Sequence, residues 1–334
     1  MGMSHNNKKT YPRVADIIGF CTPDQCVPVA EAAMTVQRDY GDRVERKHAR
    51  FKYTVEDMTI KGVRQEMEKR MGFKLQPARG YNLTDNSDRF GWIRDHDGVH
   101  WHYGLYVEHG RIVDREGYQL KTALREIAHA GAGDFRLTAN QSLIVGSIKP
   151  ADKPRIVQIL RDYGIGNDSH TGLRLNSMAC VALPTCGLAL AESQRYLPTL
   201  VDALDEVVED CGLREDAISI RMTGCPNGCA RPALGEIGLI GRAAGIYNLY
   251  LGASRTGDRL NKMWKESLNH DQIVEALGPV IRRYAAERQE GEAFGDFTCR
   301  VGIIEPNLSI PKLDFSDGEL RESGMTFHQH TPTW

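Results

Sequence analysis

Two pairs of cysteines in the second half of the chain constrain its fold more than any other feature. Cys180 and Cys186 flank CVALPTC with five residues between them, and Cys225 and Cys229 flank CPNGC with three. Each pair lies in a proline-containing loop beside a predicted strand or helix. Four thiolates from two such loops can hold one metal centre. We therefore expect the fold to bring the two loops together.

A disulfide, a zinc site, a redox pair and an iron–sulfur cluster all use paired cysteines. The N-terminal MGMSHNNKK has no apolar core and predicts no signal peptide, which favours metal-binding thiols over disulfides. Structural zinc sites place about two to four residues between paired ligands, fewer than separate Cys180 from Cys186. A 4Fe–4S cluster is larger and accepts wider loops. The spacing therefore favours an iron–sulfur cluster, with zinc or four buried structural thiols as alternatives.

The bulk properties argue against two classes of protein. A formal net charge of −2 argues against a generic nucleic-acid binder. No apolar run reaches the roughly 18 residues that a membrane span needs, so we expect a cytoplasmic protein. At 334 residues the chain is long enough for two or three domains, and its composition of 41% hydrophobic and 26% charged residues is ordinary for a globular protein.

Three regions emerge along the chain, at residues 1–92, 93–165 and 166–334. The first is polar and rich in charge and turn signals. The second alternates strand and helix patterns, which makes the fold class α+β of the ferredoxin-like type. Its predicted elements are two strands around the turn 108–110, a helix at 118–131 that Gly131 ends, two strands within 134–148, and a helix at 150–164 with Asp152 as N-cap.

The third region contains both cysteine pairs. A helix is predicted over 188–197, and Pro198 begins a second one. The strand 218–222 leads directly into the second pair, and further strands are predicted at 236–241 and 247–252. A helix is predicted over 271–287, and the polar end of the chain, ESGMTFHQHTPTW, is expected to be loosely ordered.

The residues around the cysteines resemble a known family. NSMACVALPTCGLALAESQRYLP and RMTGCPNGCARPALGEIGLIGRAAGIYNLYLGA are similar to segments of the siroheme and 4Fe–4S sulfite/nitrite reductases. YPRVADIIGF, TVQRDYGDRVERKHARFKYT, GDFRLTANQSLI and EGEAFGDFTCRVGII resemble further segments, so the likeness covers roughly residues 3–312. It implies an assimilatory sulfite reductase that reduces sulfite to sulfide with six electrons.

The resemblance also implies roles for individual residues. Cys180, Cys186, Cys225 and Cys229 would ligate the 4Fe–4S cluster, and Cys229 would bridge it to the siroheme iron. Asn227 matches a residue near the macrocycle. Siroheme carries many carboxylates, and the basic run RVERKHARFK offers Arg50 and Lys52 as the best candidates to bind them. Arg136, Asn140 and Gln141 in FRLTANQ are weaker candidates, where the ferredoxin-like unit approaches the cofactor region.

The likeness covers only half of the family protein. Family members are about twice as long and consist of two pseudo-symmetric halves, of which this chain matches the second. We therefore expect a partial chain, with residues 1–92 as the remnant of the first siroheme-binding lobe and an exposed sheet edge where the missing half would pair. The sulfite-binding Arg and Lys residues would belong to that half, so no catalytic residue can be named here.

The expected partners are sulfite, the missing half, and a flavoprotein reductase that uses NADPH, or a ferredoxin, as electron donor. No nucleic acid and no membrane are expected. AGAGD lacks the strand–loop–helix context of a dinucleotide site. A non-catalytic four-cysteine module that holds iron–sulfur or zinc is one alternative, and a nitrite-reducing relative is another. The pair Cys21 and Cys26 is interpreted as structural thiols, and His100 and His102 as strand residues without a third ligand.

Overall fold

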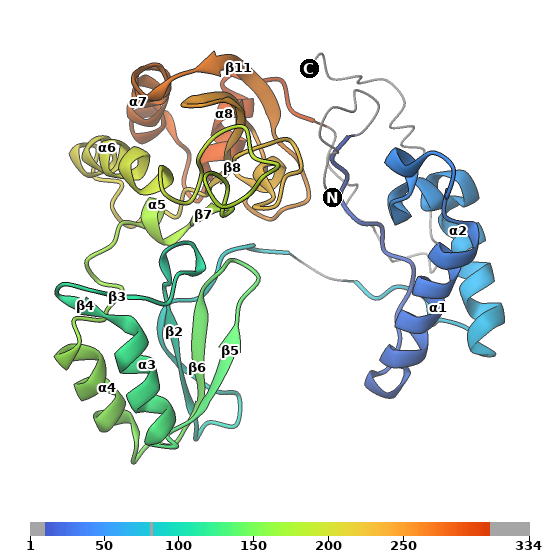
Figure 1. Cartoon of the computed structure of the whole chain (residues 1–334), viewed down its shortest axis with the longest axis horizontal. Helices are drawn as coiled ribbons and strands as arrows, with labels where there is room; N and C mark the ends of the chain where they lie inside the picture. Colours follow the sequence, from blue (N-terminus) through green and yellow to red (C-terminus); the bar gives the residue numbers. More distant parts are fainter. Residues whose placement is uncertain (1–10, 81–82, 308–334) are drawn as a thin grey trace.

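The computed structural model describes residues 11–80 and 83–307, arranged as one helical pair and two sheet-based units (Figure 1). The predicted loose tail ESGMTFHQHTPTW lies outside the described residues. No helix in the described part of the chain has both the length and the apolar character needed to cross a bilayer.

The N-terminal unit consists of two helices that the sequence analysis did not predict. α1 (Cys26–Tyr40) follows the short 3-10 helix η1 (Pro23–Gln25), and α2 (Phe51–Met71) follows η2 (Arg46–His48). α1 and α2 pack through a small core. The residues buried in it are Ala32, Val36, Val63 and Met67. A backbone bridge between Phe20 and Gln76 ties the two ends of the unit together.

The second unit is a four-stranded antiparallel sheet in the order β1-β2-β6-β5. Its strands are β1 (Gly91–Arg94), β2 (Trp101–Leu105), β5 (Asp134–Leu137) and β6 (Leu143–Ile148). The helices α3 (Leu120–His129) and α4 (Lys153–Asp162) cover one face (Figure 1). Their buried residues Leu120, Leu124, Ile127, Ile156, Ile159 and Leu160 join the strands in one core. The predicted α+β, ferredoxin-like class is confirmed.

The predicted strand after the turn 108–110 is wrong. Residues Glu108–Gly110 form the 3-10 helix η3, and the chain beyond it makes only the short ribbon β3 (Asp114–Arg115) with β4 (Tyr118–Gln119). The antiparallel partner of β2 is instead β1, earlier in the chain. Asp152 occupies the predicted N-cap position of α4 but its side chain makes no capping hydrogen bond.

The strand β5 forms an open edge of this sheet. All four of its residues are exposed, including Phe135 at 41% and Leu137 at 83%. Among the strands of residues 11–80 and 83–307, its backbone pairs only with β6. The unit therefore has the exposed sheet edge that the sequence analysis expected.

The third unit is a five-stranded mixed sheet in the order β11-β10-β9-β8-β7. β7, β8 and β9 run parallel, and β9, β10 and β11 run antiparallel. The strands are β7 (Ser177–Ala179), β8 (Ile220–Thr223), β9 (Ile237–Ala243), β10 (Ile246–Leu251) and β11 (Lys262–Leu268). The predictions at 218–222, 236–241 and 247–252 are confirmed, whereas β7 and β11 were missed.

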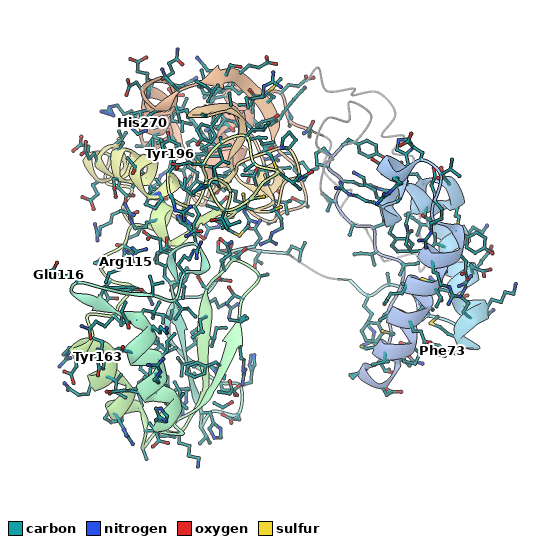
Figure 2. The ribbon with its side chains drawn as sticks, viewed as in Figure 1. Phe73, Arg115, Glu116, Tyr163, Tyr196 and His270 are labelled. Atoms are coloured by element: carbon teal, nitrogen blue, oxygen red, sulfur yellow. The ribbon has the colours of Figure 1, made fainter. Side chains whose placement is uncertain are left out.

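Helices surround this mixed sheet. They are α5 (Gly172–Leu175), α6 (Leu197–Asp210), α7 (His270–Glu287) and α8 (Phe294–Arg300), with the 3-10 helix η4 (Pro232–Leu234). The predicted helices after Pro198 and over 271–287 are confirmed. Tyr196 and His270, labelled in Figure 2, join the starts of α6 and α7 through a hydrogen bond of 3.0 Å between the Tyr196 hydroxyl and His270 Nδ1.

The predicted helix at 188–197 is wrong. Residues 188–196 form turns, and α6 begins only at Leu197. The backbone N–H groups of Leu190 and Ala191 donate to the carbonyl oxygen of Gly224, at 2.8 and 3.1 Å. These bonds tie the segment to the second cysteine loop, and the Ala191 carbonyl oxygen accepts from the Leu183 N–H instead of from a residue one turn later.

Candidate functional site

The two cysteine loops begin at the carboxyl ends of the neighbouring parallel strands β7 and β8. Cys180 follows Ala179 directly, and Ala179 pairs with Met222 of β8. The Cys180 N–H donates to the Met222 carbonyl oxygen at 3.2 Å, which continues the pairing into the loop. Because parallel strands end at the same sheet edge, the first thiol of each pair is brought to one place.

Gly224 is the point where the two loops touch. Its N–H donates to Cys180 Sγ at 3.3 Å. A Cβ atom at this position would lie 2.5 Å from the Ala191 carbonyl oxygen and 2.6 Å from the Ala182 Cβ. Only glycine allows the two backbones to approach this closely. The glycine of TGCPNGC is therefore required by packing.

Backbone groups near the second pair act to lower the pKa of its two thiols, against the stronger effect of burial. Burial raises the pKa of the Cys225 thiol, while the N–H of Asn227 in the Pro-Asn-Gly turn lowers it by hydrogen bonding to the sulfur. Burial also raises the pKa of Cys229, and its own N–H opposes that rise. The Cys180 sulfur accepts a backbone hydrogen bond, from the Gly224 N–H at 3.3 Å. Such donors stabilise sulfur ligands of an iron–sulfur cluster.

The four thiols act on one another electrostatically. After burial, the negative charges of Cys180, Cys186 and Cys229 contribute to raising the pKa of Cys225, and Cys180 and Cys186 do the same to Cys229. All eight cysteines of the chain are free thiols. The structure therefore brings the four predicted ligands to one site.

The four thiols are not arranged as a site for a single metal ion in the described part of the chain. Within residues 11–80 and 83–307, no three His, Cys, Asp or Glu side chains are close enough together to hold one metal ion. Around one zinc ion, sulfurs at about 2.3 Å from the metal lie only about 3.8 Å apart. A 4Fe–4S cluster separates its ligands further because four irons stand between them. Four cysteines, with five residues between the first pair and three between the second, suit the larger centre.

Cys229 differs from the other three thiols because it is exposed. The positive charge of Arg50, at the N-cap of α2, is among the effects that lower its pKa, against the stronger effects of burial and of Cys180 and Cys186. The Arg50 guanidinium therefore acts electrostatically on the sulfur of the exposed Cys229. This is the one predicted basic residue that the structure brings toward the cysteines within the described ranges.

Lys52 is engaged within its own helical unit. Its Nζ donates to the Tyr11 carbonyl oxygen and lies 4.6 and 5.0 Å from the ring centroids of Tyr11 and Tyr53. Burial, with help from the positive charge of Arg50, lowers its pKa to about 8. The side chain lines an apolar groove of about 510 Å³ between α1 and α2. That Arg50 and Lys52 both bind carboxylates of one cofactor therefore stays a prediction.

Two arginines beside the second cysteine loop were missed by the sequence analysis. Arg221 on β8 is only 4% exposed, and burial, followed by the charge of Arg231, lowers its pKa to about 10. Both guanidinium groups donate to Asn140 Oδ1, at 3.2 Å from Arg221 and 2.8 Å from Arg231. The Arg221 Nη1 is buried and has no hydrogen-bond partner among the residues that the structure describes. This unsatisfied cation suits an anionic group near the cysteines.

The TANQ segment links the ferredoxin-like unit to the cysteine loops. Asn140 holds both arginines, and the Gln141 Nε2 donates to the Ala179 carbonyl oxygen at 2.9 Å, one residue before Cys180. The expectation for Arg136 is wrong, because its exposed guanidinium pairs with Asp134 at 2.8 Å and with the Ser147 hydroxyl. Asn140 and Gln141 therefore position the site, while Arg136 does not reach it.

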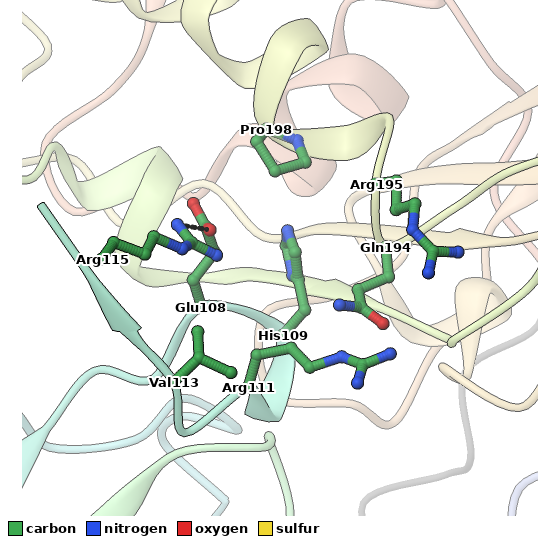
Figure 3. Close-up of a pocket in the computed structure, with 8 residues that line it drawn as sticks. All are labelled: Glu108, His109, Arg111, Val113, Arg115, Gln194, Arg195 and Pro198. Carbon is green, nitrogen blue, oxygen red and sulfur yellow. Dashed lines mark hydrogen bonds and ion pairs between the residues drawn. The ribbon is translucent and has the colours of Figure 1, made fainter. Parts of the chain in front are cut away.

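A basic pocket of about 480 Å³ lies behind the first cysteine loop (Figure 3). Its lining residues are Glu108, His109, Arg111, Val113, Arg115, Gln194, Arg195 and Pro198. Arg115 pairs with Glu108 at 2.8 Å, which leaves the charges of two arginines unbalanced within this lining. The Gln194 N–H donates to the Cys180 carbonyl oxygen at 3.0 Å, so the pocket wall is bonded to a ligand residue.

His109 is the most buried polar residue of this pocket, and Figure 3 shows it between Gln194 and the Arg115–Glu108 pair. Its Nδ1 is buried without a partner in the described part of the chain, and its backbone has a positive φ of 50°. Burial lowers its pKa to about 4, so the ring is neutral near pH 7. From the sequence this residue was predicted only as part of a turn, since no local signal distinguishes a buried histidine from a turn histidine.

The two histidines of β2's segment do not form a metal site. His100 pairs with Asp97 at 2.5 Å, whereas His102 lies 3.2 Å from Asp95 and accepts a hydrogen bond from the Ser147 N–H. Each ring thus has its own carboxylate. His102 lies in β2, whereas His100 precedes that strand, so the interpretation as strand residues holds for His102 alone.

Two family models match the sequence. The model for the nitrite and sulphite reductase 4Fe-4S domain matches residues 1–75, and the model for the nitrite/sulfite reductase ferredoxin-like half domain matches residues 93–163. The second match coincides with the four-stranded sheet and its two helices.

Curated relatives match most of the chain. The sulfite reductase (NADPH) hemoprotein beta-component of Bacillus pumilus is 52% identical over 306 residues, which are 91% of this chain and 53% of that protein. The protein of the same name from Chromohalobacter salexigens is 54% identical over 310 residues, 92% of this chain and 54% of that protein. The chain spans about half the length of the curated relatives it matches.

A solved structure shows the same fold. The NirA protein of Mycobacterium tuberculosis superposes with a TM-score of 0.74 at 25% sequence identity, covering 87% of this chain and 55% of NirA. The similarity thus extends through the ferredoxin-like unit and the cysteine-bearing sheet. In sequence and in fold, this chain belongs to the nitrite and sulfite reductase family.

Proposed function

We propose that this chain carries the cofactor-binding half of a sulfite reductase hemoprotein, which reduces sulfite to sulfide. The observation that supports this most strongly is the convergence of two cysteine loops at the ends of two parallel strands, where the Gly224 N–H donates to Cys180 Sγ and the other three thiols act electrostatically on Cys225. The similarity to two sulfite reductase hemoproteins gives the reaction.

In this proposal the four cysteines hold a 4Fe–4S cluster. The Gly224 N–H binds Cys180 Sγ. Burial raises the pKa of Cys225 and Cys229, and the backbone of Asn227 and of Cys229 acts to lower it, which stabilises the thiolates. Cys229, the exposed thiol, would be the one to reach the siroheme, as the family resemblance implies. When bound, the two cofactors supply one-electron storage and transfer next to the iron that takes sulfite.

The cations around the cysteines bind the carboxylates of siroheme. Arg50 is supported by its electrostatic effect on Cys229, and Arg221 by its buried and unpartnered Nη1. Asn227 lies in the same turn as the bridging thiol. Lys52 stays a prediction, and its Nζ donates to the Tyr11 carbonyl oxygen within the N-terminal unit. The sulfite-binding residues are assigned to the half of the relatives that this chain does not match.

We also propose a division into residues 1–92 as the remnant of a first siroheme-binding lobe, 93–165 as the ferredoxin-like half domain, and 166–334 as the lobe with the cluster. The two family matches, at 1–75 and 93–163, support the first two boundaries. A flavoprotein reductase is the proposed electron donor, with a ferredoxin as the alternative; the NADPH in the relatives' names supports a donor that uses NADPH. The cytoplasm is the proposed compartment.

The test is the cofactor content of the chain produced with a siroheme supply under anaerobic conditions. We expect haem-like Soret and red absorption bands and about four non-haem irons per chain. Zinc without iron would overturn the proposal. Iron without the haem-like bands would replace it by a non-catalytic iron–sulfur module. Co-production with the matching other half of a relative, followed by sulfide and ammonia assays, then distinguishes sulfite from nitrite reduction.

A further inference from the structure

A second cysteine pair, outside the proposed cofactor site, lies at the start of α1. The Sγ atoms of Cys21 and Cys26 are 4.0 Å apart, and both thiols are free. Cys26 is exposed, and Cys21 is partly exposed. A disulfide has a sulfur–sulfur bond of about 2.05 Å, so closure requires an approach of only about 2 Å. Side-chain rotation supplies a movement of that size.

The backbone around the pair is already held in a closed turn. The Thr22 N–H donates to Gln25 Oε1 at 3.1 Å, and the Gln25 N–H donates to the Thr22 carbonyl oxygen at 3.0 Å. On the other side, Phe20 and Gln76 exchange two backbone hydrogen bonds of 3.0 Å. The two thiols are therefore held facing each other before any bond forms, which lowers the entropy cost of linking them.

We propose that Cys21 and Cys26 are a reversible dithiol–disulfide pair that exchanges with low-molecular-weight disulfides such as oxidised glutathione. The exposed Cys26 thiolate attacks one sulfur of the small disulfide, forms a mixed disulfide, and releases one thiolate. Cys21 then loses its proton and attacks Cys26 Sγ, which releases the second small thiolate. In balance, two protein thiols lose two protons and two electrons, and one small disulfide is reduced to two thiols.

The oxidation state of Cys21 and Cys26 affects the groove between α1 and α2. Both thiols line the apolar groove between α1 and α2, together with Ile18, Phe51 and Lys52. Closing the bond fixes one end of that groove and covalently joins the turn before α1 to its first residue. The redox state of the pair therefore sets how freely the groove wall beside Lys52 can move.

The experiment equilibrates the anaerobic, cofactor-loaded chain in glutathione buffers, followed by acid quenching, alkylation and tryptic mapping. Both cysteines fall in one tryptic peptide, residues 14–38, which contains no other cysteine. We expect this peptide to lose two hydrogens and to resist alkylation as oxidised glutathione rises. Doubling both forms of glutathione at a constant ratio should halve its oxidised-to-reduced ratio, because two reduced molecules are released per bond.

Variants separate this pair from ordinary thiols. In Cys21→Ser, the peptide should instead carry a glutathione adduct on Cys26, whose fraction does not change when both glutathione forms are doubled. Cys211→Ser removes a free thiol elsewhere in the chain and should leave the result as in the wild type. Two independent adducts on the wild-type peptide, no oxidation at any ratio, or a bond to any other cysteine would overturn the proposal.

Discussion

The most informative single substitution is Asn140→Ala. The Asn140 Oδ1 accepts hydrogen bonds from Arg221 at 3.2 Å and from Arg231 at 2.8 Å. Its Nδ2 donates to the Asn86 carbonyl oxygen at 2.9 Å and to Asp88 Oδ1 at 3.2 Å. One amide side chain therefore connects the ferredoxin-like unit to the strand and loop that carry the second cysteine pair.

The loss of stability in Asn140→Ala comes mainly from Arg221. Its Nη1 has no partner among the described residues, so the substitution removes the side-chain acceptor of a guanidinium that is 4% exposed. Hydrogen bonds to charged groups contribute about 1.5–3 kcal/mol each, and an unsatisfied buried charge costs more than a neutral group. Arg231 loses less, because it keeps the Ala139 carbonyl oxygen. We expect the free energy of unfolding to fall by about 3 kcal/mol.

The assay is equilibrium urea unfolding followed by circular dichroism, combined with a double-mutant cycle. Arg221→Met removes the charge while keeping a side chain of similar length. In that background Asn140→Ala should cost only about 1 kcal/mol, because no buried guanidinium is left without an acceptor. An equal cost of Asn140→Ala in both backgrounds, or a cost below about 0.5 kcal/mol in the wild type, would refute this coupling.

Three further substitutions test the site. Gly224→Ala places a Cβ 2.5 Å from the Ala191 carbonyl oxygen and should destabilise the chain by about 1–3 kcal/mol in urea unfolding, whereas Gly166→Ala, with open space around it, should not. Cys229→Ser should abolish the coupling between the two iron centres, which is measured as a change in siroheme absorption and redox behaviour. The control variant Cys299→Ser should leave both properties as in the wild type. An unchanged siroheme spectrum in Cys229→Ser would contradict the assigned bridge. For His109, burial lowers the folded-state pKa from 6.5 to about 4, so the unfolded chain binds the proton more strongly. The stability that neutral His109 provides should be complete above about pH 6.5 and fall by up to about 3 kcal/mol as the pH drops to 4. His109→Asn, which tolerates the positive φ, should remove that pH-dependent loss in unfolding curves measured across the range; an unchanged profile would count against it.

Helices and strands with a strong periodic pattern of apolar residues could be predicted from the sequence. α3 was predicted from Leu120, Leu124 and Ile127, which lie on one helical face and are all buried. The helices α1 and α2 were missed because their shared core is small and contains Ala32 and Val36 on the α1 side. In α2 the periodicity also breaks at Thr59, whose φ of 64° interrupts the helix. Weak amphipathic patterns of this kind need tertiary packing to be recognised.

For the site, the sequence indicated the cysteines but not the groups that support them. Spacing and a proline-containing loop pointed to Cys225 and Cys229, whatever the fold around them. Arg221 alternates with apolar neighbours on β8, so a local pattern predicts a solvent-facing side chain. Its burial depends on Asn140, 81 residues earlier in the chain. No periodicity within one strand carries that information.

The pairing of β7 with β8 has a consequence for how the chain acquires metal. Cys180 and Gly224 lie 44 residues apart in sequence, and they meet because Ser177, Met178 and Ala179 face Ile220, Arg221 and Met222. Sliding β7 by two residues would keep its side chains on the same faces but move Cys180 by about 7 Å. A misaligned chain would then present two separate dithiols instead of one four-sulfur cradle. Cluster incorporation is therefore a readout of correct strand alignment, available before any catalytic assay.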